Sequence, residues 1–474
     1  MSAQGPSRHQ LSVFVLAMMN VAIIMNLRGL PMMAKEGLPM IFFLLFSTFI
    51  FLLPTSLVSA ELATGWPGGG GVYTWVKEAF GGRFGFMAIW IQWIQNLIWY
   101  PTILAFAAGA LSFLFLDPAL ANSKVFNVCV ILAIYWGATL MNFKGMKTSG
   151  WLTTAGVIGG TILPAVLIII LGLLWWGKGN PLEFMKSSHG IFPDFSNFDN
   201  ISFLAGVVLL FAGMEVSAVH ALEVKDPKKN YPRAIFLAAG IIIAIFTLSS
   251  LSIAAVIPEE KINLTIGLMQ GFKDLLSLYG IDWLLPVIGA LIAFGAIGAV
   301  TAWIVGPSKG LLATAKEGDL PPFLARTNDN GMPTHILIVQ GMIVTAVTLV
   351  YLLMPNVSSA FFLLTALTAI LYLIMYIMLF ITAIRLRYLC PEVHRTYKVP
   401  GGNAGMWIVS GVGILGAIFA ITVGFFPPAQ LTVGSPAFYV LFLTAGTVLF
   451  AGAPLLIHLF KRPDWAVSRE EETR

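Results

Sequence analysis

Long apolar stretches dominate this sequence and restrict the folds open to it more than any other feature. A helix needs about 20 apolar residues to cross the hydrocarbon core of a bilayer. Twelve such stretches cover residues 12–35, 40–63, 85–115, 124–142, 151–176, 201–223, 233–256, 284–315, 335–354, 360–384, 406–425 and 437–459. Because backbone groups in lipid must satisfy their hydrogen bonds within the segment, these stretches are predicted to be helices. The sequence therefore predicts an all-α integral membrane protein with twelve transmembrane helices.

The composition excludes a set of water-soluble domains. Only 10% of the residues are charged and 58% are hydrophobic, whereas about a quarter of the residues of a soluble domain carry charge. The net charge of +5 comes from basic residues scattered over short loops, so we predict no nucleic-acid partner. Cys129 and Cys390 lie far apart and outside any CxxC pattern. No disulfide, metal or cofactor is predicted from them.

Basic residues predict the orientation in the membrane. With both termini inside, 20 of the 27 Lys and Arg residues fall in inner segments, and 7 fall outside or within a span. Cytoplasmic loops carry the excess of Lys and Arg in membrane proteins. The first apolar run, from Leu11, lacks a small-residue cleavage pattern, so we expect it to be retained. The sequence predicts a multi-pass protein with cytoplasmic N- and C-termini.

Two charged residues lie well inside predicted spans. Arg28 lies in the first span beside Gly29 and Pro31, and Glu215 follows Gly213 in the sixth span. A charge facing lipid costs several kcal/mol, so it normally faces a cavity or a partner. Two alternatives remain open: Arg28 could snorkel to the outer interface, and Glu215 could be a hydrogen-bond acceptor that joins helices.

The spacing of these two residues predicts an internal repeat. Five crossings separate the first and sixth spans, and five crossings reverse the orientation of a helix. Helices 1–5 and 6–10 could then form a five-plus-five inverted repeat whose leading helices, 1 and 6, are broken at matching places. We assign residues 1–200 to the first repeat, 201–400 to the second, and 401–474 to helices 11 and 12 with a short cytoplasmic tail. Broken helix ends can hold the carboxylate and ammonium of an amino acid.

Other candidate features each have an ordinary structural alternative. The glycine-rich run 65–76 lacks the spacing of a phosphate-binding loop, and a re-entrant inner gate is the preferred interpretation. Trp303 could wall a cavity or simply pack. His220 could titrate near neutral pH or be an ordinary hydrogen-bonded residue. Three amides on the third span could line a wet path or join helices: Gln92, Gln95 and Asn96.

Several motifs resemble those of the amino acid–polyamine–organocation transporter superfamily, and in particular its bacterial glutamate/GABA antiporter group. They extend over nearly the whole chain and are AEL at 60–62, GGGGVYTWV at 68–76, GGRFGF at 81–86, GMEVSAVHALEVKDPKKNYPRA at 213–234, AWIVGPSKGLLATAKEGDLPP at 302–322, NDNGMPTHI at 328–336 and RTYKVPGG at 395–402. The resemblance implies an inverted-repeat core with two extra helices and a midplane substrate site between broken helices 1 and 6.

The resemblance also implies roles for individual residues. Glu215 matches the acidic residue after the helix 6 break, which takes part in substrate handling and gating, and Trp303 matches the helix 8 aromatic that flanks the substrate. The expected substrate-binding residues are Ile24, Met25, Asn26, Leu27, Arg28, Gly29, Phe211, Gly213, Met214, Glu215 and Trp303. The expected gating or coupling residues are Glu215, His220 and Trp303.

Four positions depart from the resembled pattern. Arg28 stands where these antiporters more often carry an uncharged or aromatic residue, and Ala299 stands where acid-resistance exchangers tend to carry an acidic one. The tail 461–474 is too short to resemble their C-terminal plug, so strict acid gating is not expected. Helix 5, at 151–176, lacks the lysine of some proton-coupled relatives. The absence of this lysine favours exchange over symport, and Arg28 leaves the substrate open.

Together these observations predict a secondary amino-acid antiporter of the bacterial inner membrane, working by alternating access as a monomer or homodimer in lipid. A proton-coupled importer is the alternative within transport. The six histidines are dispersed, so we predict no enzyme active site, and no repeated polar rings indicate a channel.

Overall fold

The computed structural model describes residues 12–67, 71–144, 153–186, 190–196, 198–217, 226–428, 433–462 and 465. Its described α-helices include α1 Val13–Ile24, α2 Leu30–Lys35, α3 Pro39–Ser47, α4 Leu53–Gly65, α5 Val72–Phe80, α6 Gly82–Leu114, α7 Lys124–Phe143, α9 Leu163–Gly177, α10 Leu204–Leu210, α11 Met214–Ser217, α12 Pro227–Val256, α13 Gly267–Ser277, α14 Leu285–Lys316, α15 Thr334–Thr348, α16 Val350–Leu353, α17 Val357–Leu389, α18 Gly402–Gly424 and α19 Pro436–Leu459. No strand occurs in these described ranges. The prediction of an all-α protein is confirmed.

Hydropathy and length identify the helices that can span a membrane. Ten described helical stretches are long and apolar enough, and the bent pair Val13–Ile24 and Leu27–Lys35 could form an eleventh span. A shorter apolar helical stretch, Leu204–Val216, lies where we predicted the sixth span. That predicted span, 201–223, is described only as far as Ser217. The total of twelve spans and the inverted repeat therefore stay predictions.

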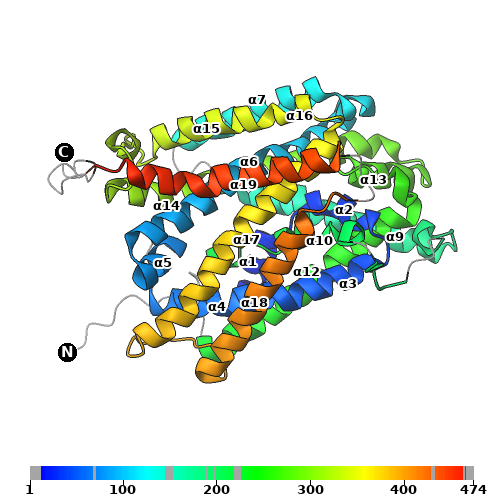
Figure 1. The fold of residues 1–474 in the computed structure, drawn as a ribbon. Helices are drawn as coiled ribbons and strands as arrows, with labels where there is room; N and C mark the ends of the chain where they lie inside the picture. Colours follow the sequence, from blue (N-terminus) through cyan, green and yellow to red (C-terminus); the bar gives the residue numbers. More distant parts are fainter. Residues whose placement is uncertain are drawn as a thin grey trace, which may run out of the picture.

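Two long helices form the centre of the bundle (Figure 1). In α6, 83% of an apolar stretch of 18 residues is buried inside the protein, and in α17 the share is 72%. These two helices pack against each other, and α6 also packs along α14. By contrast, only 11% of the corresponding apolar stretch of α19 is buried, so this helix lies at the periphery. The central helices position the site described below.

Contacts between helix ends bring several predicted inner segments together. Lys461, just after α19, forms an ion pair of 2.6 Å with Asp319, just after α14. Lys77 on α5 pairs with Glu317 at 2.5 Å. In Figure 1 the ends of α14 and α19 lie on the same side as α5, while α13 lies on the opposite side. These three predicted inner segments thus lie together at one end of the bundle.

Candidate functional site

The first span is interrupted near Gly29 and Pro31, two residues that weaken the continuity of a helix. α1 ends at Ile24, and Met25 and Asn26 adopt extended backbone conformations. A 3-10 turn, Leu27–Gly29, then leads into α2, and the two halves of the span meet at 54°. The Asn26 side chain accepts the backbone N–H of Arg28 at 2.9 Å, which stabilises the turn locally.

The helical stretch in the sixth position is interrupted as well. α10 ends at Leu210, a turn covers residues 211–213, and α11 begins at Met214. Gly213 has a φ of +115°, which side chains of L-residues rarely allow. Its backbone N–H donates to the Tyr376 hydroxyl at 2.7 Å. Local sequence thus permits this break, and a side chain from α17 stabilises it.

The two interruptions contact each other. A Cβ atom added to Gly29 would lie 2.5 Å from a methyl carbon of Leu210, at the end of α10. A Cβ atom added to Gly213 would lie 3.4 Å from Ile23 and 3.5 Å from the Trp303 ring. Small residues at both breaks therefore allow close packing of the two segments. The expectation that interrupted first and sixth segments face each other agrees with these contacts.

A cavity of about 500 Å³ lies beside the two breaks. Six of the predicted substrate-binding residues line it: Ile24, Met25, Asn26, Arg28, Glu215 and Trp303. The remaining five are not among its lining residues; Leu27, Phe211 and Met214 are buried, and Gly29 and Gly213 form the contacts between the breaks. His220 lies outside the described residues. The cavity is large enough for a small solute.

Glu215 is buried, and its carboxylate accepts three hydrogen bonds from side chains. Its carboxylate accepts hydrogen bonds from Gln92 Nε2 at 3.0 Å and from the Tyr372 hydroxyl at 2.5 Å. The Tyr376 hydroxyl also donates to it. Glu215 therefore joins α11 to α6 and α17, and it also lines the cavity. Glu215 therefore both faces a cavity and accepts hydrogen bonds that join helices, so the two interpretations are compatible.

Arg28 is also buried, with 3% of its surface exposed. Its Nη1 donates to Thr102 Oγ1 at 3.0 Å and to Thr365 Oγ1 at 3.1 Å, from α6 and α17 respectively. Its guanidinium carbon lies 5.5 Å from the centre of the Phe361 ring. The alternative in which Arg28 snorkels to the outer interface is wrong, because the side chain points into the helix bundle.

The Nε–H of the Arg28 guanidinium has no hydrogen-bond acceptor in the described part of the chain. Among the described residues no ion pair includes Arg28, and its Nε has no hydrogen-bond partner. A buried donor without an acceptor costs free energy. An anionic group that entered the cavity would supply an acceptor and a counter-charge.

Polar and aromatic side chains complete the wall. The three amides on α6 all line the cavity, and the side chains of Gln95 and Asn96 donate to the Gln92 carbonyl. Trp303 is partly buried, with its ring centre 6.2 Å from that of Trp99. The amides thus line a cavity, and two of them also donate hydrogen bonds to a backbone carbonyl of their own helix.

The sequence analysis did not identify Tyr372 and Tyr376 as site residues. They lie four residues apart on α17, so both hydroxyls project from one helix face toward Glu215. A sequence signal for these two site residues was present, because the phenol groups of YLIMY, at 372–376, are polar groups within a mostly apolar span. The described residues hold no group of three or more His, Cys, Asp or Glu that could bind a metal.

A multi-pass helical membrane protein whose interrupted helices meet beside a polar cavity belongs to the class of solute transporters. Comparison with known proteins identifies the family. The model of the amino acid permease family matches residues 9–450, and this chain belongs to that family.

Three relatives that cover most of the chain bear the names of transporters. An uncharacterized transporter of Legionella pneumophila is 41% identical, covering 98% of this chain and 99% of the relative. A glutamate/gamma-aminobutyrate antiporter of Lactococcus lactis is 34% identical, over 95% of this chain and 91% of the relative. A probable agmatine/putrescine antiporter of Lactococcus lactis is 26% identical, over 84% of each chain.

Proposed function

We propose that this protein exchanges amino acids across a bacterial inner membrane by alternating access, as an antiporter of the glutamate/GABA-exchanger type. The observation that carries the proposal is the meeting of two helix interruptions beside a cavity that contains Arg28 and Glu215. Interrupted helices leave backbone N–H and C=O groups that can hold a carboxylate and an ammonium. The names of the antiporter relatives support the same function.

Arg28 favours a substrate with a second carboxylate, such as glutamate. A unit ion pair at about 4 Å contributes about 4 kcal/mol at an effective dielectric constant of about 20, before desolvation. Desolvation offsets much of this energy. A preference of about tenfold requires only about 1.4 kcal/mol to remain.

The cavity supports an inward-facing arrangement for this state. It reaches Gly71 and Val72, at the start of α5, and Lys309 on α14, all on the side predicted to be cytoplasmic. Arg28, which also lines the cavity, bridges the first break to α6 and α17. In our proposal Trp303 closes against the solute, and the core then reorients to release it on the other side.

Counterflow in proteoliposomes tests this function. Vesicles loaded with unlabelled glutamate or GABA should take up external labelled glutamate, whereas empty vesicles should not. Arg28→Ala should reduce the uptake of glutamate about tenfold or more relative to a neutral amino acid. Equal uptake of acidic and neutral amino acids by wild type and variant would remove Arg28 from the substrate site.

A proton-coupled importer is the second candidate, and the carboxyl group of Glu215 at the cavity favours it. A pH gradient imposed on empty vesicles discriminates the two functions. Accumulation of labelled glutamate under those conditions would select symport over exchange.

A further inference from the structure

An apolar pocket lies at the predicted cytoplasmic end of the bundle, apart from the substrate cavity. Its volume is about 350 Å³, and its walls come from α6, α14, α15, α19 and the segment 320–324 that follows α14. The lining residues include Trp93, Leu311, Ile336, Val339, Leu456 and Phe460. The described residues that line it are all apolar or aromatic, and none of them lines the substrate cavity. The protein therefore contains a second, chemically different space.

The polar groups of the two α6 indoles in the wall are already bonded. Trp93 Nε1 donates to Gln340 Oε1 at 2.7 Å, and Trp90 Nε1 donates to the Phe450 carbonyl at 2.9 Å. A water molecule is held in a cavity only where several polar partners surround it. An unfilled void deprives its lining of dispersion contacts. The pocket therefore suits an apolar occupant better than water.

The pocket opens toward the surface that faces lipid. Its floor is buried, because Trp93, Leu311 and Ile336 are only 1–2% exposed. On its α19 side, by contrast, Leu456 is 59% exposed and Phe460 is 74% exposed. α19 is also the least buried of the described spans. A hydrocarbon chain of the surrounding bilayer can therefore enter the pocket from the side.

Charged residues flank this opening. Lys461 and Arg462 directly follow Phe460, and both are exposed. The acidic residues after α14, Glu317 and Asp319, form ion pairs with a lysine of α5 and with Lys461. Both acidic charges are thereby compensated, and Arg462 adds positive charge at the opening. Basic residues at a membrane surface attract anionic lipid headgroups.

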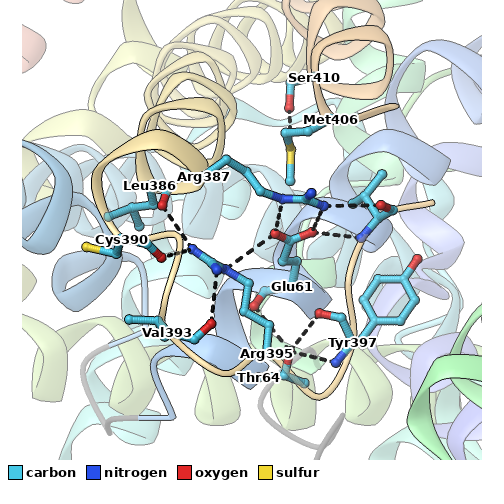
Figure 2. Close-up of polar contacts among 11 residues, drawn as sticks. Glu61, Thr64, Leu386, Arg387, Cys390, Val393, Arg395, Tyr397, Met406 and Ser410 are labelled. Atoms are coloured by element: carbon cyan, nitrogen blue, oxygen red, sulfur yellow. Dashed lines mark hydrogen bonds and ion pairs between the residues drawn. The ribbon is translucent and has the colours of Figure 1, made fainter. Parts of the chain in front are cut away.

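Three other charges at the predicted cytoplasmic end are buried and bound to one another (Figure 2). Arg387 Nη2 and the Val399 backbone N–H donate to the Glu61 carboxylate at 2.6 and 2.7 Å. Arg395 Nε lies 3.5 Å from the same carboxylate, and its Nη groups donate to three backbone carbonyls near the end of α17. The cluster around Glu61 thus stabilises the ends of α4 and α17 and exposes no cation to a headgroup.

We propose that the apolar pocket binds an acyl chain of an anionic phospholipid, whose phosphate lies near Arg462. The apolar lining selects the chain, and the basic residues at the opening select the charge of the headgroup. The last residues of the sequence, SREEETR at 468–474, are polar and do not suit such a pocket. This lipid site goes beyond the proposed transport function and does not depend on the solute that is carried.

Native mass spectrometry of the purified protein tests the site. The protein in detergent is titrated with dioleoylphosphatidylglycerol or dioleoylphosphatidylethanolamine, which carry the same chains but differ in net charge. One lipid molecule should stay bound, and the phosphatidylglycerol should bind about fivefold more tightly. Arg462→Gln should abolish this preference and leave the binding of phosphatidylethanolamine unchanged.

Matched substitutions on α15 locate the chain. Val339 lines the pocket, whereas Met342 on the same helix is 55% exposed and is not among the lining residues. Val339→Phe fills part of the pocket and should weaken the binding of both lipids about tenfold or more. Met342→Phe adds a ring outside the pocket and should leave binding unchanged.

Val339→Ala supplies a variant that does not overpack the pocket. It enlarges the void, which costs stability when the void is empty. Bound phosphatidylglycerol should therefore raise the melting temperature of Val339→Ala more than that of wild type. This measurement keeps the test decisive even where Val339→Phe fails to fold.

The proposal is overturned if wild type retains no lipid, if Val339→Phe and Met342→Phe retain lipid equally, or if lipid stabilises Val339→Ala no more than wild type. Equal binding of the two lipids by wild type would overturn the choice of an anionic headgroup. A protein dimer that forms in place of the lipid complex would also overturn the proposal, because a second copy would then cover the pocket. Absence of glutamate counterflow would count against the proposed function alone, since lipid binding requires no solute.

Discussion

The hydroxyl of Tyr376 forms hydrogen bonds with two groups of the site, the backbone N–H of Gly213 and the carboxylate of Glu215. Removing this hydroxyl therefore tests whether it stabilises the break at Gly213. It accepts the backbone N–H of Gly213 at 2.7 Å and donates to Glu215. Tyr376→Phe keeps the ring and leaves no cavity, but it leaves a buried N–H without a partner and removes one donor to a carboxylate. Each loss costs about 1–3 kcal/mol, so we expect a total of about 2–6 kcal/mol.

Tyr372→Phe is the matched control. The Tyr372 hydroxyl donates to Glu215 Oε1 at 2.5 Å, but Gln92 Nε2 donates to the same oxygen at 3.0 Å. Its removal therefore costs only one hydrogen bond, about 1–3 kcal/mol, and orphans no backbone group. Both residues are buried in the same helix, so differences in exposure do not confuse the comparison.

Thermal unfolding of the purified protein in detergent, followed by tryptophan fluorescence, measures the difference. The melting temperature should fall in the order wild type, Tyr372→Phe, Tyr376→Phe. Counterflow should fall in the same order, because Tyr376 also holds the geometry of the break at Gly213. An equal or larger loss of stability in Tyr372→Phe would refute the assignment of the break to the Tyr376 hydroxyl.

Three further predictions concern packing, the break and pH. Gly160→Ala should destabilise the fold by about 1–3 kcal/mol or more, because the added Cβ would lie 2.3 Å from the α14 backbone. In the control Gly159→Ala, the added Cβ meets nothing nearer than 3.9 Å, so this variant should keep the wild-type stability. The melting temperatures of the two variants test this difference. Gly213→Ala, at a φ of +115°, should weaken glutamate binding, measured by equilibrium binding, and a wild-type affinity would contradict the role of this conformation. Burial, reinforced by repulsion from Glu259, raises the pKa of Glu36 to about 8 from an ordinary value of 4.5. Its raised folded-state pKa means that stability is lost as pH rises from about 4.5 to about 8. The melting temperature of Glu36→Gln should therefore exceed that of wild type increasingly over this interval, and a gap independent of pH would contradict the prediction.

The positions of the helices could be predicted well from the sequence, because apolar length is a local property. The stretch 85–115 became α6, Gly82–Leu114, and 406–425 became α18, Gly402–Gly424. The break at 25–29 was also predictable, since Asn26 and Gly29 favour turns by their own chemistry. These features depend on residues within one or two turns of each other.

The partners of the buried charges could not be predicted, because they come from distant parts of the chain. Arg28 meets Thr102 and Thr365, which lie 74 and 337 residues away in sequence. Hydropathy gives the depth of a residue along a span, but not the neighbour that it faces after helices pack. The same limitation hid the cluster around Glu61, whose partner Arg387 is 326 residues away.

One helix connects all of these contacts. α17 is an uninterrupted helix of 33 residues that binds Arg28 through Thr365, the Gly213 break through Tyr376, and Glu61 through Arg387. Thr365 and Arg387 are separated by about 33 Å along its axis, which is close to the thickness of the hydrocarbon core, about 30 Å.

A rigid helix that holds both ends of the pathway cannot move at one contact without disturbing the other. Thr365→Val, which removes one acceptor of Arg28 at nearly constant volume, should therefore slow counterflow. Combined with Arg387→Lys, which loses the paired donors to Glu61, its effect should depart from additivity by about 0.5 kcal/mol or more. Strictly additive effects would mean that the two contacts work independently, and α17 would then be a static support rather than the element that couples them.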